Sequence, residues 1–215
     1  MDCATHICQA LERAARGEAP YRHWLLDDVL PSAVAAALAA LPLQAPPIGD
    51  TLGRRETHNA ARIFVNPESR ARFSVCAELA AALQAPGTIA RFEQCCGVSL
   101  AGSYLRVEYC LDAGGFWLEP HTDIGAKLFT FLIYLSDHPD AADWGTDILD
   151  ADHRLAMRAP ADFNRGLIFV PAADTWHGFA PRRIDGVRRS LIVNYVVPEW
   201  RSRHELAFPE APIRA

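Results

Sequence analysis

The spacing of hydrophobic and polar residues divides the chain into a helical front half and a strand-rich back half. In the front half, apolar residues recur with helical spacing over residues 32–43, 67–84 and 88–97, which predicts three helices. Ser32 is the expected N-cap of the first helix, and Pro67 is expected to begin the second. Two short strands are expected around these helices, at residues 21–31 and 61–66.

The back half has a different pattern, in which short β-branched and aromatic segments follow one another with turn residues between them. Turn signals stand at residues 112–115 (DAGG) and 185–186 (DG). Many short strands with no helices between them indicate an antiparallel sandwich or barrel. The expected fold class is therefore α+β and mainly β, with the front half supplying helices that support one sheet. The predicted strands are residues 103–110, 115–123, 127–136, 166–171, 175–180 and 190–197.

No repeat, low-complexity tract or linker interrupts the chain, so residues 1–215 are expected to form a single domain. Within it, residues 1–98 are expected to give helical support with edge strands, and residues 99–200 to form the core. Residues 201–215 would form a C-terminal tail. Because this tail alternates apolar and charged residues, it could pack on its own domain or on a second subunit. The sequence therefore does not predict an oligomeric state.

Composition narrows the classes of partner. Of the 215 residues, 50% are hydrophobic and the formal net charge is −5, an ordinary globular balance. No face is obviously basic, so neither nucleic acid nor an anionic membrane is expected as a partner. The N-terminus carries charges where a signal peptide needs an apolar core, and the alanine-rich run 33–43 is too short to cross a bilayer. The six cysteines form no C-x-x-C motif, so we expect a soluble, reduced, cytoplasmic protein.

The stretch EPHTDIGAKLF, residues 119–129, places His121 and Asp123 two residues apart at the approach to a long apolar strand. Side chains at i and i+2 of a strand point to the same side. Such a pair could hold a metal ion, or it could be a core histidine bonded to an aspartate. A third candidate ligand, His177, follows in a strand–loop–strand segment. Its presence favours the interpretation that His121 and Asp123 hold a metal ion. A second His-x-Asp, at residues 138–140, lies in a polar stretch and is interpreted as a solvent-facing loop.

A candidate anion site follows His177 across the DG turn. On the strand that begins there, Arg188, Ser190 and Asn194 share one face by alternation. An arginine fork with a neighbouring hydroxyl can hold a carboxylate through two hydrogen bonds. A slip of one residue in register would put Arg189 in the place of Arg188, because it would exchange the two faces of the strand. Asn194 is a candidate to line the site.

Together these segments resemble the Fe(II)- and 2-oxoglutarate-dependent oxygenases, specifically the prolyl 4-hydroxylase-like branch. The resemblance covers residues 103–197 and consists of ordered motifs rather than one pattern. It implies a double-stranded β-helix (jelly-roll) core over residues 99–200, with the site in its mouth. The motifs are Tyr109 before a Gly-rich turn, PHTD with His121 and Asp123, LIYLS with Tyr134, GLIFVP followed by WH with His177, and GVRRSL with Arg188.

The resemblance also implies the chemistry. His121, Asp123 and His177 would form a facial triad for Fe(II), which leaves positions for 2-oxoglutarate and dioxygen. The protein would then be a dioxygenase that hydroxylates an unactivated C–H bond of an organic substrate, with release of succinate and CO2. The residues implied in binding 2-oxoglutarate are Arg188, Ser190, Tyr134 and Tyr109.

The substrate is not specified by these motifs. A small metabolite, such as an amino acid or sugar derivative, and a peptidyl proline both stay open. The tentative substrate residues are Asn194, Arg62 and Asp147. Asp147, in the segment WGTDIL, could instead solvate a turn, which is the favoured interpretation. Arg62 could form a rim with His58 and Asn66, although a solvated strand face is slightly preferred.

Three other functions are alternatives to this interpretation. A halogenase of the same superfamily is disfavoured, because such enzymes replace the carboxylate ligand with a small residue and Asp123 is present. A cupin-like metal hydrolase or isomerase would use the same three ligands without 2-oxoglutarate, and the Arg188/Ser190 pair argues against it. A non-catalytic jelly-roll binding protein is disfavoured by a triad placed around open metal positions.

Overall fold

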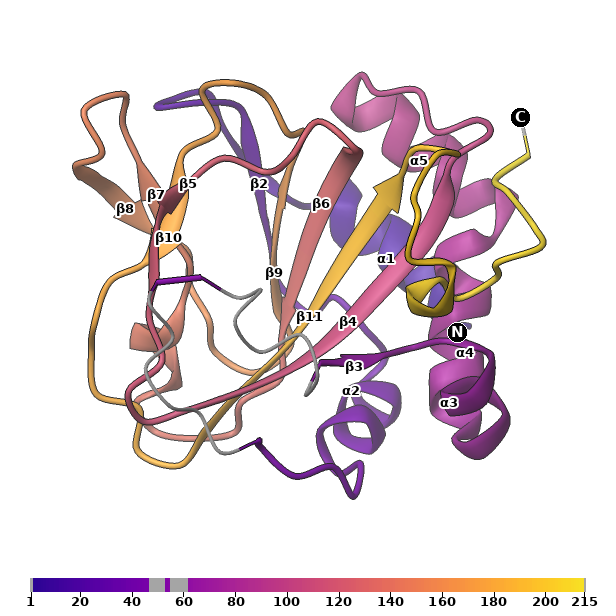
Figure 1. Ribbon diagram of the computed structural model, residues 1–215, viewed down its shortest axis with the longest axis horizontal. Coiled ribbons are helices and arrows are strands. Elements are labelled where there is room, and N and C mark those ends of the chain that lie inside the picture. Colours follow the sequence, from indigo (N-terminus) through magenta and orange to yellow (C-terminus); the bar gives the residue numbers. More distant parts are fainter. Residues whose placement is uncertain (1, 47–52, 55–61, 215) are drawn as a thin grey trace.

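Two antiparallel sheets face each other in the structure, a computed structural model that describes residues 2–46, 53–54 and 62–214 (Figure 1). The larger sheet has the order β1-β2-β9-β6-β11-β4-β3, and the smaller has the order β5-β10-β7-β8. This α+β, mainly β arrangement confirms the predicted jelly-roll fold class. The strands are β1 (Ala15–Gly17), β2 (His23–Leu26), β3 (Ile63–Phe64), β4 (Tyr104–Ala113), β5 (Leu118–His121), β6 (Lys127–Tyr134), β7 (Asp147–Leu149), β8 (Leu155–Arg158), β9 (Arg165–Phe169), β10 (His177–Phe179) and β11 (Val187–Val196).

Helices of the front half cover the outer face of the larger sheet (Figure 1). The predicted helix over residues 67–84 is in fact two helices, because Phe73 is extended (φ −126°, ψ 111°). Asn66 caps the first of these through reciprocal hydrogen bonds with Ser69. Ser32 is the first helical residue rather than the N-cap, a place taken by Pro31 with no side-chain cap. The helices are α1 (Cys3–Glu12), α2 (Ser32–Ala39), α3 (Pro67–Arg72), α4 (Ser74–Gln84) and α5 (Pro86–Cys96).

The central strands of the larger sheet have two chemically different faces. β11 lies between β4 and β6, with Leu191 opposite Tyr109 and Ile133. These side chains belong to the hydrophobic core beneath the helices. Side chains of opposite parity face the smaller sheet, and many are polar. Alternation along three paired strands therefore separates an apolar core from a polar interior surface.

The C-terminal residues pack on their own chain beside β4. Ala207 N donates to Leu105 O at 2.9 Å, and Ile213 N donates to Ser103 O at 2.8 Å. A short 3₁₀ turn, Arg203–Glu205, precedes these contacts. Among the described residues, no helix has the length and apolar character needed to cross a membrane.

Replacing Phe92 with alanine tests the contact between α5 and the sheet. The Phe92 ring is 1% exposed, and its centroid lies 4.8 Å from that of Phe129. We expect Phe92→Ala to lower the free energy of unfolding by about 3–5 kcal/mol, since a large buried side chain is removed. Gln94→Ala, at an exposed position of the same helix, should change it by less than about 0.5 kcal/mol. Urea unfolding measures both, and equal effects would contradict this packing.

Candidate metal centre and ligand cavity

A cavity of about 480 Å³ lies between the two sheets. Its walls include His121 and His177 from the smaller sheet and Thr130 and Arg188 from the larger one. Its volume lies within the range of small-molecule sites. The predicted metal ligands and the predicted anion-binding arginine therefore line the same cavity.

The two histidines lie side by side because β5 and β10 pair with His121 directly opposite His177. Their ring centroids are 4.3 Å apart. Each Nδ1 donates to a backbone carbonyl two residues earlier, His121 to Glu119 O at 2.8 Å and His177 to Thr175 O at 2.9 Å. A carbonyl only accepts, so each ring carries its proton on Nδ1 and keeps a lone pair on Nε2. This is the tautomer and the anchoring found in metal-binding histidines.

Burial keeps His177 neutral. Its pKa is lowered from 6.5 to about 4, first by burial and then by the neighbouring His121. The carboxylate of Asp123 opposes this shift without reversing it. At neutral pH the Nε2 lone pair of His177 is therefore available to a ligand.

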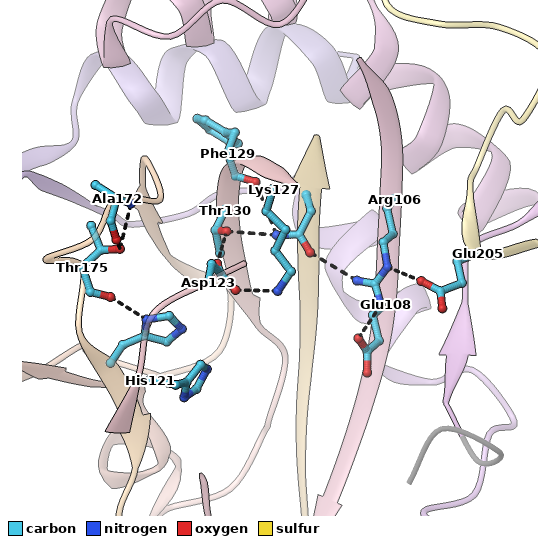
Figure 2. A network of polar contacts seen from close by, with 12 residues as sticks. Arg106, Glu108, His121, Asp123, Lys127, Phe129, Thr130, Ala172, Thr175 and Glu205 are labelled. Atoms are coloured by element: carbon cyan, nitrogen blue, oxygen red, sulfur yellow. Dashed lines mark hydrogen bonds and ion pairs between the residues drawn. The ribbon is translucent and has the colours of Figure 1, made fainter. Parts of the chain in front are cut away.

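Asp123 is held as a carboxylate by two donors from β6. Its Oδ1 accepts a hydrogen bond from Lys127 Nζ at 2.5 Å, and its Oδ2 accepts one from Thr130 Oγ1 at 2.6 Å (Figure 2). Burial alone would raise the pKa of Asp123, but the Lys127 ammonium, with His177 and these hydrogen bonds, lowers it to about 2. The sequence interpretation missed both partners.

The donor set fits a divalent metal ion, with one adjustment. Two neutral imidazole nitrogens and a carboxylate are the ligands of a facial triad. Within the described residues, however, no three His, Cys, Asp or Glu side chains stand in metal-binding geometry. Asp123 is turned toward Lys127 and Thr130 (Figure 2). Each of its oxygens keeps a further lone pair, so completing the set would require this side chain to turn toward the two histidines.

Arg188 lies in the cavity with its charge already balanced. Its Nη1 contacts Asp112 Oδ2 at 2.6 Å and Ser190 Oγ at 3.4 Å, and its Nε donates to Trp144 O at 2.6 Å. Arg189 has the opposite parity on β11 and does not line the cavity. Asp112, opposite Arg188 on β4, lies in a predicted turn and was not expected at the site.

Tyr134 and Ser190, both implied in binding 2-oxoglutarate, lie beside Arg188 but do not themselves line the cavity. The Arg188 Cζ is 5.8 Å from the Tyr134 ring centre. The Tyr134 hydroxyl bonds Thr146 Oγ1 at 3.0 Å, and Thr146 N donates to the same hydroxyl at 3.3 Å. Thr146 lines the cavity. No motif marks Thr146 in the sequence, and only the pairing of β7 with β10 brings its segment here.

Two expectations are corrected. Tyr109 lies on the helix-facing side of β4, and its hydroxyl donates to Leu38 O of α2 at 2.7 Å, so it does not reach the cavity. Asp147 neither solvates a turn nor lines the cavity. It is a buried carboxylate of β7 that pairs with Arg158 at 3.0 Å and also with Arg182.

The tentative substrate residues take different places. Arg62 lines the cavity and pairs with Glu108 through two hydrogen bonds of 3.0 and 2.6 Å. Asn194 is fully buried and bonds Thr130 at 2.9 Å and Arg106 at 3.2 Å, so it connects parts of the site without lining it. Asn66 caps α3 instead of forming a rim, and His58 lies outside the described residues.

Comparisons with known proteins bear on the fold. No protein-family model matches the sequence, and no curated protein matches it. Among solved structures, a Pseudomonas putida prolyl-4-hydroxylase is 15% identical with a TM-score of 0.57, covering 92% of this chain and 98% of its own. A Trichoplax adhaerens prolyl hydroxylase in complex with a hypoxia inducible factor peptide is 12% identical with a TM-score of 0.62, covering 90% and 88%. An oxidoreductase of the 2OG-Fe(II) oxygenase family from Burkholderia pseudomallei is 17% identical with a TM-score of 0.53, covering 99% and 94%.

These similarities extend over nearly the whole of each chain. The protein therefore has the fold of the 2-oxoglutarate and Fe(II) oxygenases, as the sequence resemblance implied. At these levels of identity the likeness concerns the fold.

In the metal-free protein, His177 should make the folded state less stable as the pH falls. Its pKa is about 4 in the folded state and 6.5 ordinarily, so between these values the unfolded chain binds a proton that the folded chain does not. The free energy of unfolding should therefore not vary with pH on account of His177 above about pH 6.5. It should fall as the pH decreases toward about 4, by at most about 3 kcal/mol. Urea unfolding of chelator-treated protein across this range measures it.

The comparison that isolates His177 uses two variants. His177→Gln should flatten the pH dependence, whereas His204→Gln, at an exposed position, should leave it unchanged. An unaltered slope in His177→Gln would show that His177 is not the responsible group.

Proposed function

We propose that the protein is an Fe(II)- and 2-oxoglutarate-dependent dioxygenase that hydroxylates an unactivated C–H bond of an organic substrate. The observation that carries this proposal is the pair of anchored histidines, 4.3 Å apart, in the same cavity as a buried arginine. The structural neighbours named as prolyl hydroxylases and as a 2OG-Fe(II) oxygenase support the class.

Three residues would hold the metal. His121 and His177 would donate Nε2, and Asp123 would supply a carboxylate oxygen after rotation of its side chain. Lys127 bonds Oδ1 of Asp123 and Thr130 bonds Oδ2, so the donor to the oxygen that does not meet the metal would keep the carboxylate in one orientation. Bound Fe(II) and 2-oxoglutarate would together supply the oxidising chemistry, with dioxygen consumed and succinate and CO2 released.

Arg188 would bind the far carboxylate of 2-oxoglutarate. Ser190 lies 3.4 Å from its Nη1 and would keep the fork oriented, while Tyr134 and Thr146 close the same region. Leu132, which lines the cavity nearby, would help to exclude water from the carboxylate. The substrate would be a small metabolite or a peptidyl proline, and it would occupy the remaining space.

A cupin-like metal hydrolase or isomerase is the second candidate, and one observation favours it. Arg188 is already paired with Asp112 at 2.6 Å, so its charge does not require a ligand carboxylate. Binding of 2-oxoglutarate distinguishes the two candidates.

The first test needs no substrate. Under anaerobic conditions, Fe(II) followed by 2-oxoglutarate should give the visible charge-transfer band of the chelate. His121→Ala and His177→Ala should each abolish the band, because each removes a metal ligand, whereas His204→Ala should retain it. Iron binding without a band would favour the hydrolase or isomerase. A band of full intensity in His177→Ala would contradict the metal assignment.

Asp112→Asn tests whether Asp112 competes with the co-substrate for Arg188. Removing this negative charge should strengthen 2-oxoglutarate binding by about tenfold, because the dianion then meets an unbalanced arginine. The same change should lower the free energy of unfolding of the ligand-free protein by about 3 kcal/mol, since a buried charge loses its partner. Calorimetric titration of the metal-loaded protein and urea unfolding measure the two effects.

The double variant Asp112→Asn/Arg188→Met is the matched control. It removes both charges and should recover part of the stability while binding 2-oxoglutarate poorly. Weaker binding of 2-oxoglutarate in Asp112→Asn alone would mean that Asp112 positions Arg188 instead of competing for it.

A further inference from the structure

One end of the cavity is built by residues that follow β11. Trp200, Ser202 and Glu205 line it, and we refer to these three residues as the C-terminal wall. Glu205 contacts Arg106, which lies on the same face of β4 as Asp112 but six positions earlier. At the rise of a β-strand, this separation is about 20 Å. The C-terminal wall is therefore distant from the region of Arg188.

Glu205 offers an acceptor that the protein does not use. The residue is 8% exposed, and its Oε2 accepts a hydrogen bond from Arg106 Nε at 2.5 Å (Figure 2). Its other carboxylate oxygen, Oε1, accepts no hydrogen bond from any residue that the structure describes. A nearly buried carboxylate with an unused oxygen at a cavity is suited to a hydrogen-bond donor, most strongly to a charged one.

Trp200 offers a donor that the protein does not use. Its Nε1 is buried and has no hydrogen-bond partner within the described part of the chain. Leaving such a buried group unpaired is unfavourable, and an acceptor on a ligand would pair it. Ser202 adds a hydroxyl that can accept or donate. The C-terminal wall thus presents an acceptor and donors together.

The surrounding charges decide what kind of ligand fits. Among the described residues, Arg62 and Arg106 are balanced by Glu108 and Glu205 in a chain of ion pairs of 2.5 to 3.1 Å. A ligand with only a positive or only a negative group would add an uncompensated charge to this end of the cavity. A ligand with one of each would add none.

We propose that the C-terminal wall binds the zwitterionic headgroup of a free α-amino acid. The ammonium group donates to Glu205 Oε1, and the carboxylate accepts from Trp200 Nε1 with the help of the Ser202 hydroxyl. This deepens the proposed function, on which it rests for the reaction, by naming the class of substrate.

The position of the wall relative to the candidate metal ligands supports this assignment. Asn194 bonds both Arg106 and Thr130, and Thr130 in turn bonds Asp123. The headgroup site therefore lies beside the candidate metal centre, linked to it by fixed side chains, and an amino acid held there would extend its side chain into the cavity. The cavity of about 480 Å³ suits such a molecule together with a co-substrate.

The test compares each proteinogenic L-amino acid with its N-acetyl derivative, which lacks the positive charge, and its methyl ester, which lacks the negative one. Thermal unfolding of the metal-free protein reports binding, and succinate release by the Fe(II)-loaded protein reports turnover. At least one free amino acid should raise the unfolding midpoint and stimulate succinate release, whereas both of its capped forms should do neither.

Three variants test whether the residues of the C-terminal wall bind the amino acid. Glu205→Gln should weaken amino-acid binding by about tenfold or more, because a charged hydrogen bond becomes a neutral one. Trp200→Phe, which removes only the indole N–H, should weaken it by a smaller factor. Glu199→Gln, at an exposed position of the same segment, should leave binding unchanged. If Glu205→Gln does not fold, as its own unfolding curve would show, Trp200→Phe decides the outcome.

The outcomes separate this inference from the proposed function. If the anaerobic band forms but no free amino acid binds, or capped forms and proline-containing peptides bind as well as the free form, the inference is wrong and the oxygenase proposal stands. If a free amino acid binds through Glu205 but no band forms with 2-oxoglutarate, the headgroup site stands and the oxygenase proposal fails.

Discussion

The pairing of β11 with β4 on one side and β6 on the other fixes the part of the site that the larger sheet supplies. In this register Arg188 lies opposite Asp112, and Asn194 lies opposite Arg106 and Thr130. Because strand side chains alternate, a slip of one residue would turn these polar groups into the helix-covered core. The apolar residues of the other face, packed beneath α4 and α5, make such a slip costly. Packing of the hydrophobic core thus fixes the register of the strands that line the cavity.

The same register brings oppositely charged side chains together along the cavity. The buried Arg188 is balanced by Asp112, and the buried Arg106 is balanced by Glu108 and Glu205. Such pairs add little net stability, because desolvation offsets their attraction, but removing one partner is costly. Their effect is to keep charged side chains in fixed positions before any ligand arrives. Ligands that enter must replace or supplement these contacts, which limits them to molecules of matching charge.

The fold class could be predicted because it depends on the succession of short strands along the chain. The candidate residues His121, Asp123 and His177 could be selected from local signals, since the first two lie two residues apart in one motif and His177 follows a short apolar strand. Tyr109 was misplaced because its role depends on parity within β4, which follows from the pairing with β11 rather than from the motif. The roles of Lys127, Asp112 and Thr146 could not be predicted for a related reason. Each of these residues interacts with a partner that only the folded chain brings close.

The segment from Arg188 to Glu205 connects the two ends of the cavity within a single stretch of chain. β11 (Val187–Val196) carries Arg188 near its start and runs through the middle of the larger sheet. The chain beyond β11 then turns back to supply Trp200 and Glu205. The proposed co-substrate region would thereby be built on a central strand, where neighbours on both sides hold it rigid. The proposed substrate region would be built on a loop and a short 3₁₀ turn, which tolerate substitution more readily than a paired strand does. Substitutions in that loop and turn therefore need not disturb the pairing of β5 with β10, on which the positions of the two histidines depend.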